Sequence, residues 1–156
     1  MKFAPLFVGL ALLTLPACKQ EAKETPAAAV EAKPGILLSD ARLALPAVKG
    51  NPGAAYFTIE NKGTGSVSIS AASVAKAGKA EMHTTDGGSM APIDRLDVEG
   101  GATIKFAPGG LHVMVFDLDG ALKVGDTGEL TVTFADGDKA SVPLKYEAPG
   151  MAGMEH

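Results

Sequence analysis

The sequence predicts an all-β domain, a β-sandwich or barrel made of short strands. No stretch of a dozen residues carries apolar side chains at helical spacing. Roughly eight or nine short, β-prone segments follow one another at fairly regular intervals instead. Gly, Pro, Asn and Asp separate these segments, as expected where strands end in turns.

The expected strands begin near Ile36 and end at Tyr146. Residues 67–71, VSISA, alternate apolar and polar side chains, which indicates a half-buried strand. Residues 135–138, ADGD, place Asp-Gly between the last two segments and predict a hairpin. The expected strands after the first are 54–60, 67–71, 80–84, 93–98, 102–106, 111–118, 129–134 and 139–146.

The first 17 residues are expected to be an export signal. Residues 1–17 combine a positive Lys2 with an apolar run that is too short to span a bilayer, as is typical of a signal peptide. Cys18, the only cysteine, follows Leu-Pro-Ala in a segment that resembles a bacterial lipobox. Ordinary cleavage near Ala17, with Cys18 incidental, is the alternative. We expect lipidation of Cys18, because an unpaired thiol in an exported protein is otherwise a liability.

These features predict a periplasmic lipoprotein held to the membrane by its lipid. Residues 18–34 would form the lipidated Cys and a flexible tether, since they are rich in Lys, Glu, Ala and Pro and lack large apolar side chains. Residues 35–148 would form the folded domain, and residues 149–156 a small polar tail. Without Lys2 the chain has 13 basic and 18 acidic residues, a net charge of −5, which argues against nucleic acid as a partner.

The common catalytic motifs are missing from the sequence. It contains no GxSxG, HExxH or CxxC motif and no phosphate-binding glycine loop. We therefore expect a protein that is not an enzyme.

Methionine accompanies every histidine of the chain. Met82 adjoins His83, while Met114 and Met154 each lie two positions from a histidine. Thioether sulfur is soft and neutral, and together with imidazole it favours Cu(I) over Zn(II), Mg(II) or Ca(II). Thioethers also remain available as ligands in an oxidising compartment, where thiolates form disulfides. This pairing predicts a soft-metal site.

Four side chains form the expected Cu(I) site: His83, Met90, His112 and Met114. His112 and Met114 are two apart in a β-prone segment, so they point to one face of a strand. His83 ends another expected strand, and Met90 follows it in a polar loop where packing gives little reason for a methionine. Taken singly, Met114 fits a core position, His112 a hydrogen-bonded interior histidine, and His83 a surface residue.

The spacing of these residues resembles that of the PCu(A)C-type periplasmic copper chaperones. In that family a methionine is followed by 21 residues and then His-x-Met. Here residues 91–111 separate Met90 from His112, and Met114 completes the motif. The strand ending in Glu-Met-His83-Thr, the Gly-Gly pair at 100–101 and the Pro-Gly-Gly-Leu before His112 are also similar to the family pattern, over about residues 36–147.

The resemblance implies a cupredoxin-like Greek-key β-sandwich that binds Cu(I). It also implies delivery of copper to the CuA centre of cytochrome c oxidase, with the subunit carrying CuA or another copper chaperone as partner. The family usually has ten residues between the first histidine and the methionine, whereas six separate His83 from Met90 here. Either Met90 reaches the metal by a tighter route, or the site has three ligands. An accessory copper site in the tail, at Met151, Met154 and His156, is a further expectation.

Two other functions fit the sequence. A periplasmic copper-buffering or resistance protein would use the same site without a dedicated acceptor. A structural or adhesion β-sandwich would carry the Met and His pairs by accident. A blue-copper electron carrier is disfavoured, because such sites need a cysteine thiolate and Cys18 lies far from the domain.

Overall fold

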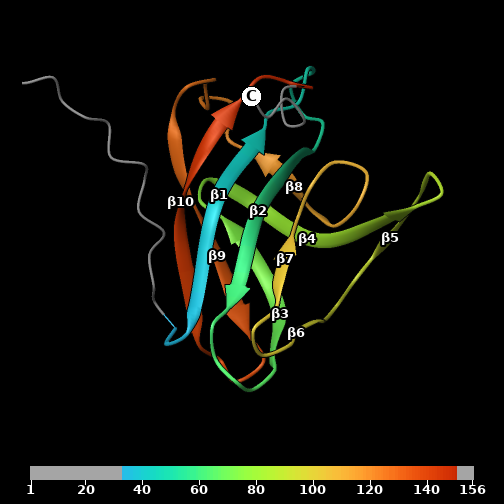
Figure 1. The fold of residues 1–156 in the computed structure, drawn as a ribbon. Helices are drawn as coiled ribbons and strands as arrows, with labels where there is room; N and C mark the ends of the chain where they lie inside the picture. The colour runs from blue at the N-terminus through green and yellow to red at the C-terminus, as the bar shows by residue number, and fades with distance from the viewer. Residues whose placement is uncertain (1–32, 151–156) are drawn as a thin grey trace, which may run out of the picture.

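The computed structural model describes residues 33–150, which form one mixed β-sheet of ten strands (Figure 1). The all-β prediction is confirmed, and within residues 33–150 no helix is long and apolar enough to cross a membrane. The strands are β1 (Ile36–Ala44), β2 (Gly53–Asn61), β3 (Val67–Val74), β4 (Ala77–Asp86), β5 (Ser89–Pro92), β6 (Leu96–Val98), β7 (Thr103–Lys105), β8 (His112–Leu118), β9 (Thr127–Phe134) and β10 (Lys139–Glu147). The predicted signal peptide, Cys18 and the tail ligands Met151, Met154 and His156 lie outside the described residues.

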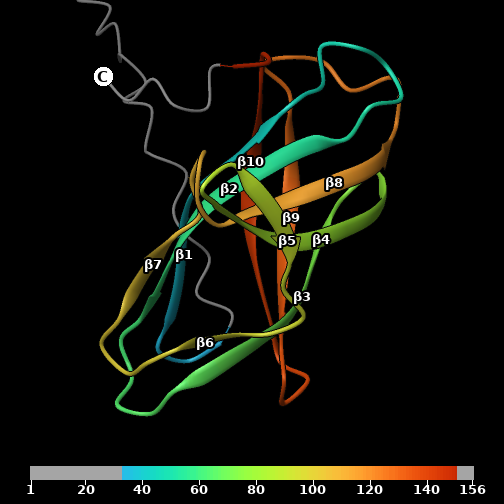
Figure 2. The same cartoon turned by 90° about the vertical axis from the view of Figure 1, so that its right-hand side faces the viewer.

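The strand order is β5-β4-β8-β2-β1-β10-β9-β3-β6, with β7 paired to the remaining part of β2. β1 and β10 run parallel, and the other pairs are antiparallel. The sheet folds over on itself, so that β3 and β9 lie behind β1 and β2 (Figures 1 and 2). This order places β4 and β8 side by side near one edge, with only β5 beyond them.

The core lies between the two layers and is filled by one face of each long strand. Alternate residues of β1, β9 and β10 are buried, as the period of a half-buried strand requires. Phe57 of β2 stacks on Phe106, which follows β7, with ring centres 4.2 Å apart and planes inclined by 16°. The largest fully buried side chains are Phe57, Phe106, Phe134, Ile36, Leu38, Leu43, Ile59, Ile69, Leu130, Leu144, Val98 and Val113.

The segment after His83 differs from the prediction. We expected a loop carrying Met90 and then a strand over residues 93–98, but Met90 belongs to β5, and β6 covers only Leu96–Val98. Gly87 and Gly88 have φ of 55° and 86°, the left-handed backbone that a two-residue hairpin turn needs. The glycine pair therefore makes a tight β4–β5 hairpin in place of a loop, and this hairpin extends away from the body of the domain (Figure 1).

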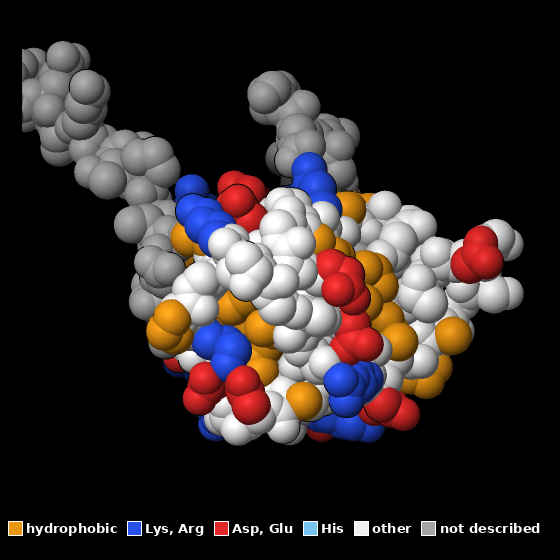
Figure 3. All heavy atoms as spheres, turned by 60° about the horizontal axis from the view of Figure 1, so that its bottom comes forward, with side chains coloured by type: hydrophobic (Ala, Val, Ile, Leu, Met, Phe, Trp, Pro, Cys, Tyr) orange, Lys and Arg blue, Asp and Glu red, His pale blue; other side chains and the backbone are white. Residues whose placement is uncertain are grey.

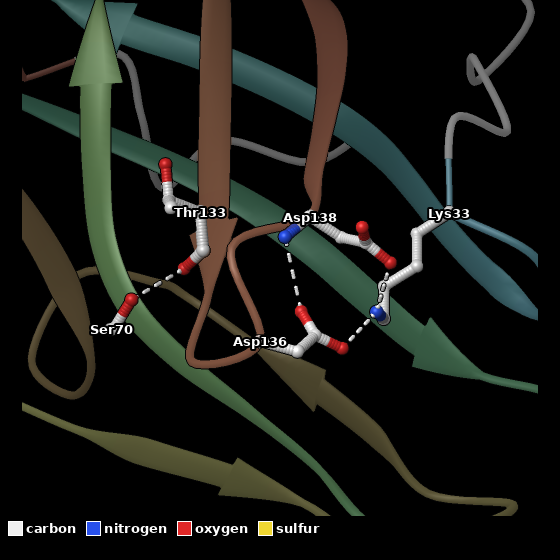
Figure 4. Close-up of polar contacts among 5 residues, drawn as sticks. All are labelled: Lys33, Ser70, Thr133, Asp136 and Asp138. Carbon is white, nitrogen blue, oxygen red and sulfur yellow. Dashed lines mark hydrogen bonds and ion pairs between the residues drawn. The ribbon is translucent and has the colours of Figure 1, made fainter.

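Lys33 fixes the start of the domain to the β9–β10 hairpin. Its Nζ lies 2.5 Å from Oδ2 of Asp136 and 2.6 Å from Oδ2 of Asp138, and its side chain is only 10% exposed (Figure 4). The ammonium also sits 5.1 Å from the centre of the Phe134 ring. Acidic and basic side chains lie next to one another at this end of the molecule (Figure 3). Lys33, which we placed in the tether, is thus packed against the domain.

Replacing Lys33 by alanine should lower stability more at neutral pH than in strong acid. The hydrogen bond from Lys33 lowers the pKa of Asp136 below its ordinary value of 3.8, and the same pairing raises the pKa of Lys33. A carboxyl with a lowered pKa stabilises the fold above its unfolded pKa, and the benefit disappears as pH falls through the folded pKa. The midpoints of thermal unfolding of wild type and Lys33→Ala should therefore differ most near pH 7, and the gap should narrow below the lowered pKa of Asp136, leaving only the loss of packing against Phe134. Lys123→Ala, at an exposed position, is the control; an equal loss there, or a gap that does not narrow in acid, would contradict this role.

Candidate metal site

The β4–β8 ladder places His83 directly opposite His112. The two strands pair antiparallel, and these histidines are register partners. Their ring centres lie 5.9 Å apart with the planes inclined by 37°. A metal–nitrogen bond is about 2.0 Å long, so two imidazoles on one ion have ring centres about 4.5–6.3 Å apart. The observed separation therefore suits two rings that share a metal.

Met114 joins the histidines on the same face. Val113 and Val115 are fully buried in the core, so the alternate residues His112 and Met114 point to the opposite face of β8. Met114 pairs with Ala54 of β2 on one side and with Glu81 of β4 on the other. The strand geometry expected for the His-x-Met motif is thus present.

A backbone carbonyl orients the His112 ring. Its Nδ1 lies 2.9 Å from the oxygen of Gly110, and because a carbonyl only accepts, Nδ1 carries the proton and donates. The same oxygen accepts the backbone N–H of Thr85 at 3.1 Å, which joins the turn before β8 to β4. With Nδ1 occupied, Nε2 of His112 is the nitrogen left to bind a metal.

His83 has buried ring nitrogens that the protein itself does not satisfy. Among the described residues, neither Nδ1 nor Nε2 of His83 has a hydrogen-bond partner. The nearest carboxylate oxygen, Oε2 of Glu81, lies 3.8 Å from Nε2, beyond hydrogen-bond distance. Buried polar atoms without partners destabilise a fold by about 1–3 kcal/mol each. A bound ion would relieve that cost, which is why this ring fits a ligand better than a structural role.

Met90 lies on the same face but farther along the hairpin. It pairs with Thr85, two residues beyond His83, and its side chain is 55% exposed. A diagonal neighbour of this kind has its Cα about 7–8 Å away, within reach of a long side chain. The six residues between His83 and Met90 thus form a two-residue turn and its flanking strand ends, which place Met90 on the face that carries His83.

Met82 takes no part in the site. It is 4% exposed and packs in the core, because adjacent residues of a strand point to opposite faces. Its position next to His83 in the sequence is thus a packing feature and not a second thioether ligand.

The donor set is neutral and soft. Across the part of the chain that the structure describes, no three His, Cys, Asp or Glu side chains are grouped so as to hold a metal. Two imidazoles completed by thioethers would make a neutral, soft donor set of the kind that suits Cu(I).

Glu81 is the residue that the sequence analysis missed. It lies two positions before His83 and opposite Met114, so it shares their face of the sheet. Its Oε1 accepts from Nζ of Lys79 at 2.7 Å, and this contact is the main reason why its pKa is lowered. Strand alternation around His83 was the signal in the sequence that placed Glu81 on this face.

Comparison with solved structures confirms the cupredoxin-like fold. The copper-bound PCuAC domain from PmoF2 matches 74% of this chain and 94% of its own, with a TM-score of 0.64 and 20% identity. The apo PCuAC domain from PmoF1 matches 74% of this chain and 95% of its own length, with a TM-score of 0.62 and 26% identity. The Cu(I) form of DR1885 from Deinococcus radiodurans matches 75% of this chain and 80% of its own length, with a TM-score of 0.61 and 26% identity. The resemblance to PCu(A)C domains is likewise confirmed.

Sequence comparison gives the family. "Putative lipoprotein Lxx21020" of Leifsonia xyli subsp. xyli is 28% identical over an alignment of 99 residues, and the match covers 59% of this chain and 60% of that protein. The chain thus matches less than two thirds of the length of this relative. The family model of LpqE-like lipoproteins matches residues 36–145, nearly the whole folded domain. The chain belongs to the LpqE-like family, with a domain of the PCuAC type.

Proposed function

We propose that this domain binds Cu(I) and carries it to an acceptor outside the cytoplasm. The observation that carries the proposal is the pairing of His83 with His112 across β4 and β8, where the buried nitrogens of His83 lack a partner among the described residues. Met114 supplies a thioether on the same face, and the Cu(I) form of DR1885 shares the fold. The family of lipoproteins to which the chain belongs agrees with a membrane-anchored protein outside the cytoplasm.

The CuA centre of cytochrome c oxidase is the proposed destination, reached directly or through another copper chaperone. A site without thiolates holds copper less permanently than a thiolate site, which suits transfer better than storage. Met90 is half-exposed on the edge strand β5 and would give an acceptor a point of access to the copper.

Anaerobic titration with a competing Cu(I) chelator tests binding, and gene deletion tests destination. One equivalent of Cu(I) should bind through His83 and His112, besides any held by the expected tail site, and Zn(II) should not displace it. A deletion strain should lose oxidase activity and regain it with added copper. A deletion strain that is sensitive to copper but has normal oxidase activity would instead identify a copper-buffering protein. Failure to bind Cu(I) would leave the structural β-sandwich as the better description.

Replacing Met90 by leucine should weaken Cu(I) binding less than replacing His83 by alanine does. Leucine keeps the volume of the side chain and removes only the sulfur. Met90 is half-exposed and lies on β5, which neighbours the strand of His83 but not that of His112. We expect a loss of about tenfold or less, about 1.4 kcal/mol, in the chelator competition. Equal losses for Met90→Leu and His83→Ala would show instead that the hairpin closes fully over the metal.

A further inference from the structure

Glu81 lies beside the ligands without belonging to the donor set. On the outer face of β4 and β8 it stands opposite Met114, and the next pair on that face is His83 with His112. Its two carboxylate oxygens have different surroundings. Oε1 is held by Nζ of Lys79 at 2.7 Å, whereas Oε2 points toward Nε2 of His83 at 3.8 Å. One oxygen is fixed, and the other is free to accept.

His83 needs a group that decides which nitrogen binds the metal. A metal-bound histidine usually donates its second ring N–H to a carboxylate or a carbonyl, and this contact fixes its tautomer. His112 has such a partner in the Gly110 carbonyl. Among the described residues, His83 has no hydrogen-bond partner for either nitrogen, and Glu81 is the acidic group within 4 Å of its ring.

We propose that Glu81 is a positioning residue that accepts a hydrogen bond from Nε2 of His83 in the copper-loaded protein and so presents Nδ1 to the metal. This inference rests on the proposed function. The shift required is small, because the present distance of 3.8 Å must shorten by less than about 1 Å to reach the usual N–H···O range. Lys79 assists by holding the carboxylate at its other oxygen. The two histidines then bind one ion through different nitrogens, His83 through Nδ1 and His112 through Nε2.

Long-range ¹H–¹⁵N correlation spectra of the Cu(I)-loaded chain test this assignment, since Cu(I) is diamagnetic. In the wild type, the His83 ring should show a protonated Nε2 and a metal-bound Nδ1, and His112 the reverse. Glu81→Ala should abolish the single tautomer of His83 and weaken Cu(I) binding about 10–100-fold, the range known for outer-shell partners. Glu81→Gln keeps an acceptor oxygen and should restore the tautomer and most of the affinity.

Glu99→Ala removes a carboxylate at an exposed position and serves as the control for charge. Dispersed amide resonances show that each variant is folded, and the ring-nitrogen assignment of His83 in the wild type carries the test if Glu81→Ala is not. The inference is overturned if Nε2 of His83 holds the metal, or if Glu81→Ala binds copper as the wild type does. It is also overturned if a folded Glu81→Gln is as weak as Glu81→Ala. In all these outcomes the wild type still binds Cu(I), so the proposed function survives. A wild type that binds no Cu(I) refutes both proposals.

Discussion

Replacing His112 by alanine should lower the Cu(I) affinity by more than 100-fold. His112 is 5% exposed, its Nδ1 is fixed by the Gly110 carbonyl, and its ring faces that of His83 across the ladder. Loss of an outer-shell partner already costs about 10–100-fold, and loss of a direct ligand should exceed that range. Competition with a Cu(I) chelator under anaerobic conditions measures the effect.

Two methionines on neighbouring strands provide the matched control. Met114→Leu removes a thioether from the site, whereas Met82→Leu removes one from the core, where exchange of methionine for leucine is usually tolerated at less than about 1.5 kcal/mol. Met114→Leu should weaken Cu(I) binding, and Met82→Leu should leave it unchanged. If both variants bind alike, or if His112→Ala keeps the wild-type affinity, the metal is held elsewhere.

Replacing Phe106 by alanine should destabilise the fold by about 3–5 kcal/mol, the range measured for buried aromatic residues. Phe106 is fully buried and stacks on Phe57, and its backbone N–H donates to the Phe57 carbonyl at 2.8 Å. Aromatic pairs of this kind add about 0.5–1.5 kcal/mol to the effect of burial. Chemical denaturation measures the change in free energy of unfolding.

The position of Phe106 links this loss to the metal site. It precedes the turn in which Ala107 donates to the Leu111 carbonyl at 2.7 Å, and that turn presents the Gly110 oxygen to His112. Phe106→Leu, which retains more of the buried volume, should be less destabilised and should bind Cu(I) nearly as the wild type does. A loss below about 1 kcal/mol for Phe106→Ala would show that the β2–β7 packing is not needed for stability.

Strand periodicity was enough to predict most of the fold. Residues 54–60 and 111–118 lie within or almost within β2 and β8, because alternating or continuous apolar side chains specify a strand locally. The order of the strands depends on long-range pairing, such as the parallel contact of β1 with β10, which no local pattern encodes. β5 was missed because its four residues are all exposed and carry no apolar alternation.

The site was predicted from residue types, and its geometry needed the structure. The two-residue spacing of His112 and Met114 predicted that both side chains lie on one face of a strand. The pairing of His83 with His112 depends on the register between two strands that are distant in the sequence, which no local pattern specifies. The same register places Glu81 opposite Met114; strand alternation around His83 predicts the face that Glu81 occupies, but its position across from Met114 needed the structure. The Gly87-Gly88 pair, which we took as part of a loop, was the signal for the hairpin that carries Met90.

X-ray absorption of the Cu(I)-loaded protein tests the central claim most directly. The account predicts one copper ion with nitrogen neighbours near about 2.0 Å and at least one sulfur near about 2.3 Å, by analogy with imidazole and sulfur bonds to zinc. The sulfur signal should persist in Met82→Leu and shrink in Met114→Leu. Copper surrounded only by nitrogen and oxygen, or a sulfur signal unchanged by Met114→Leu, would contradict a site built from His83, His112 and Met114.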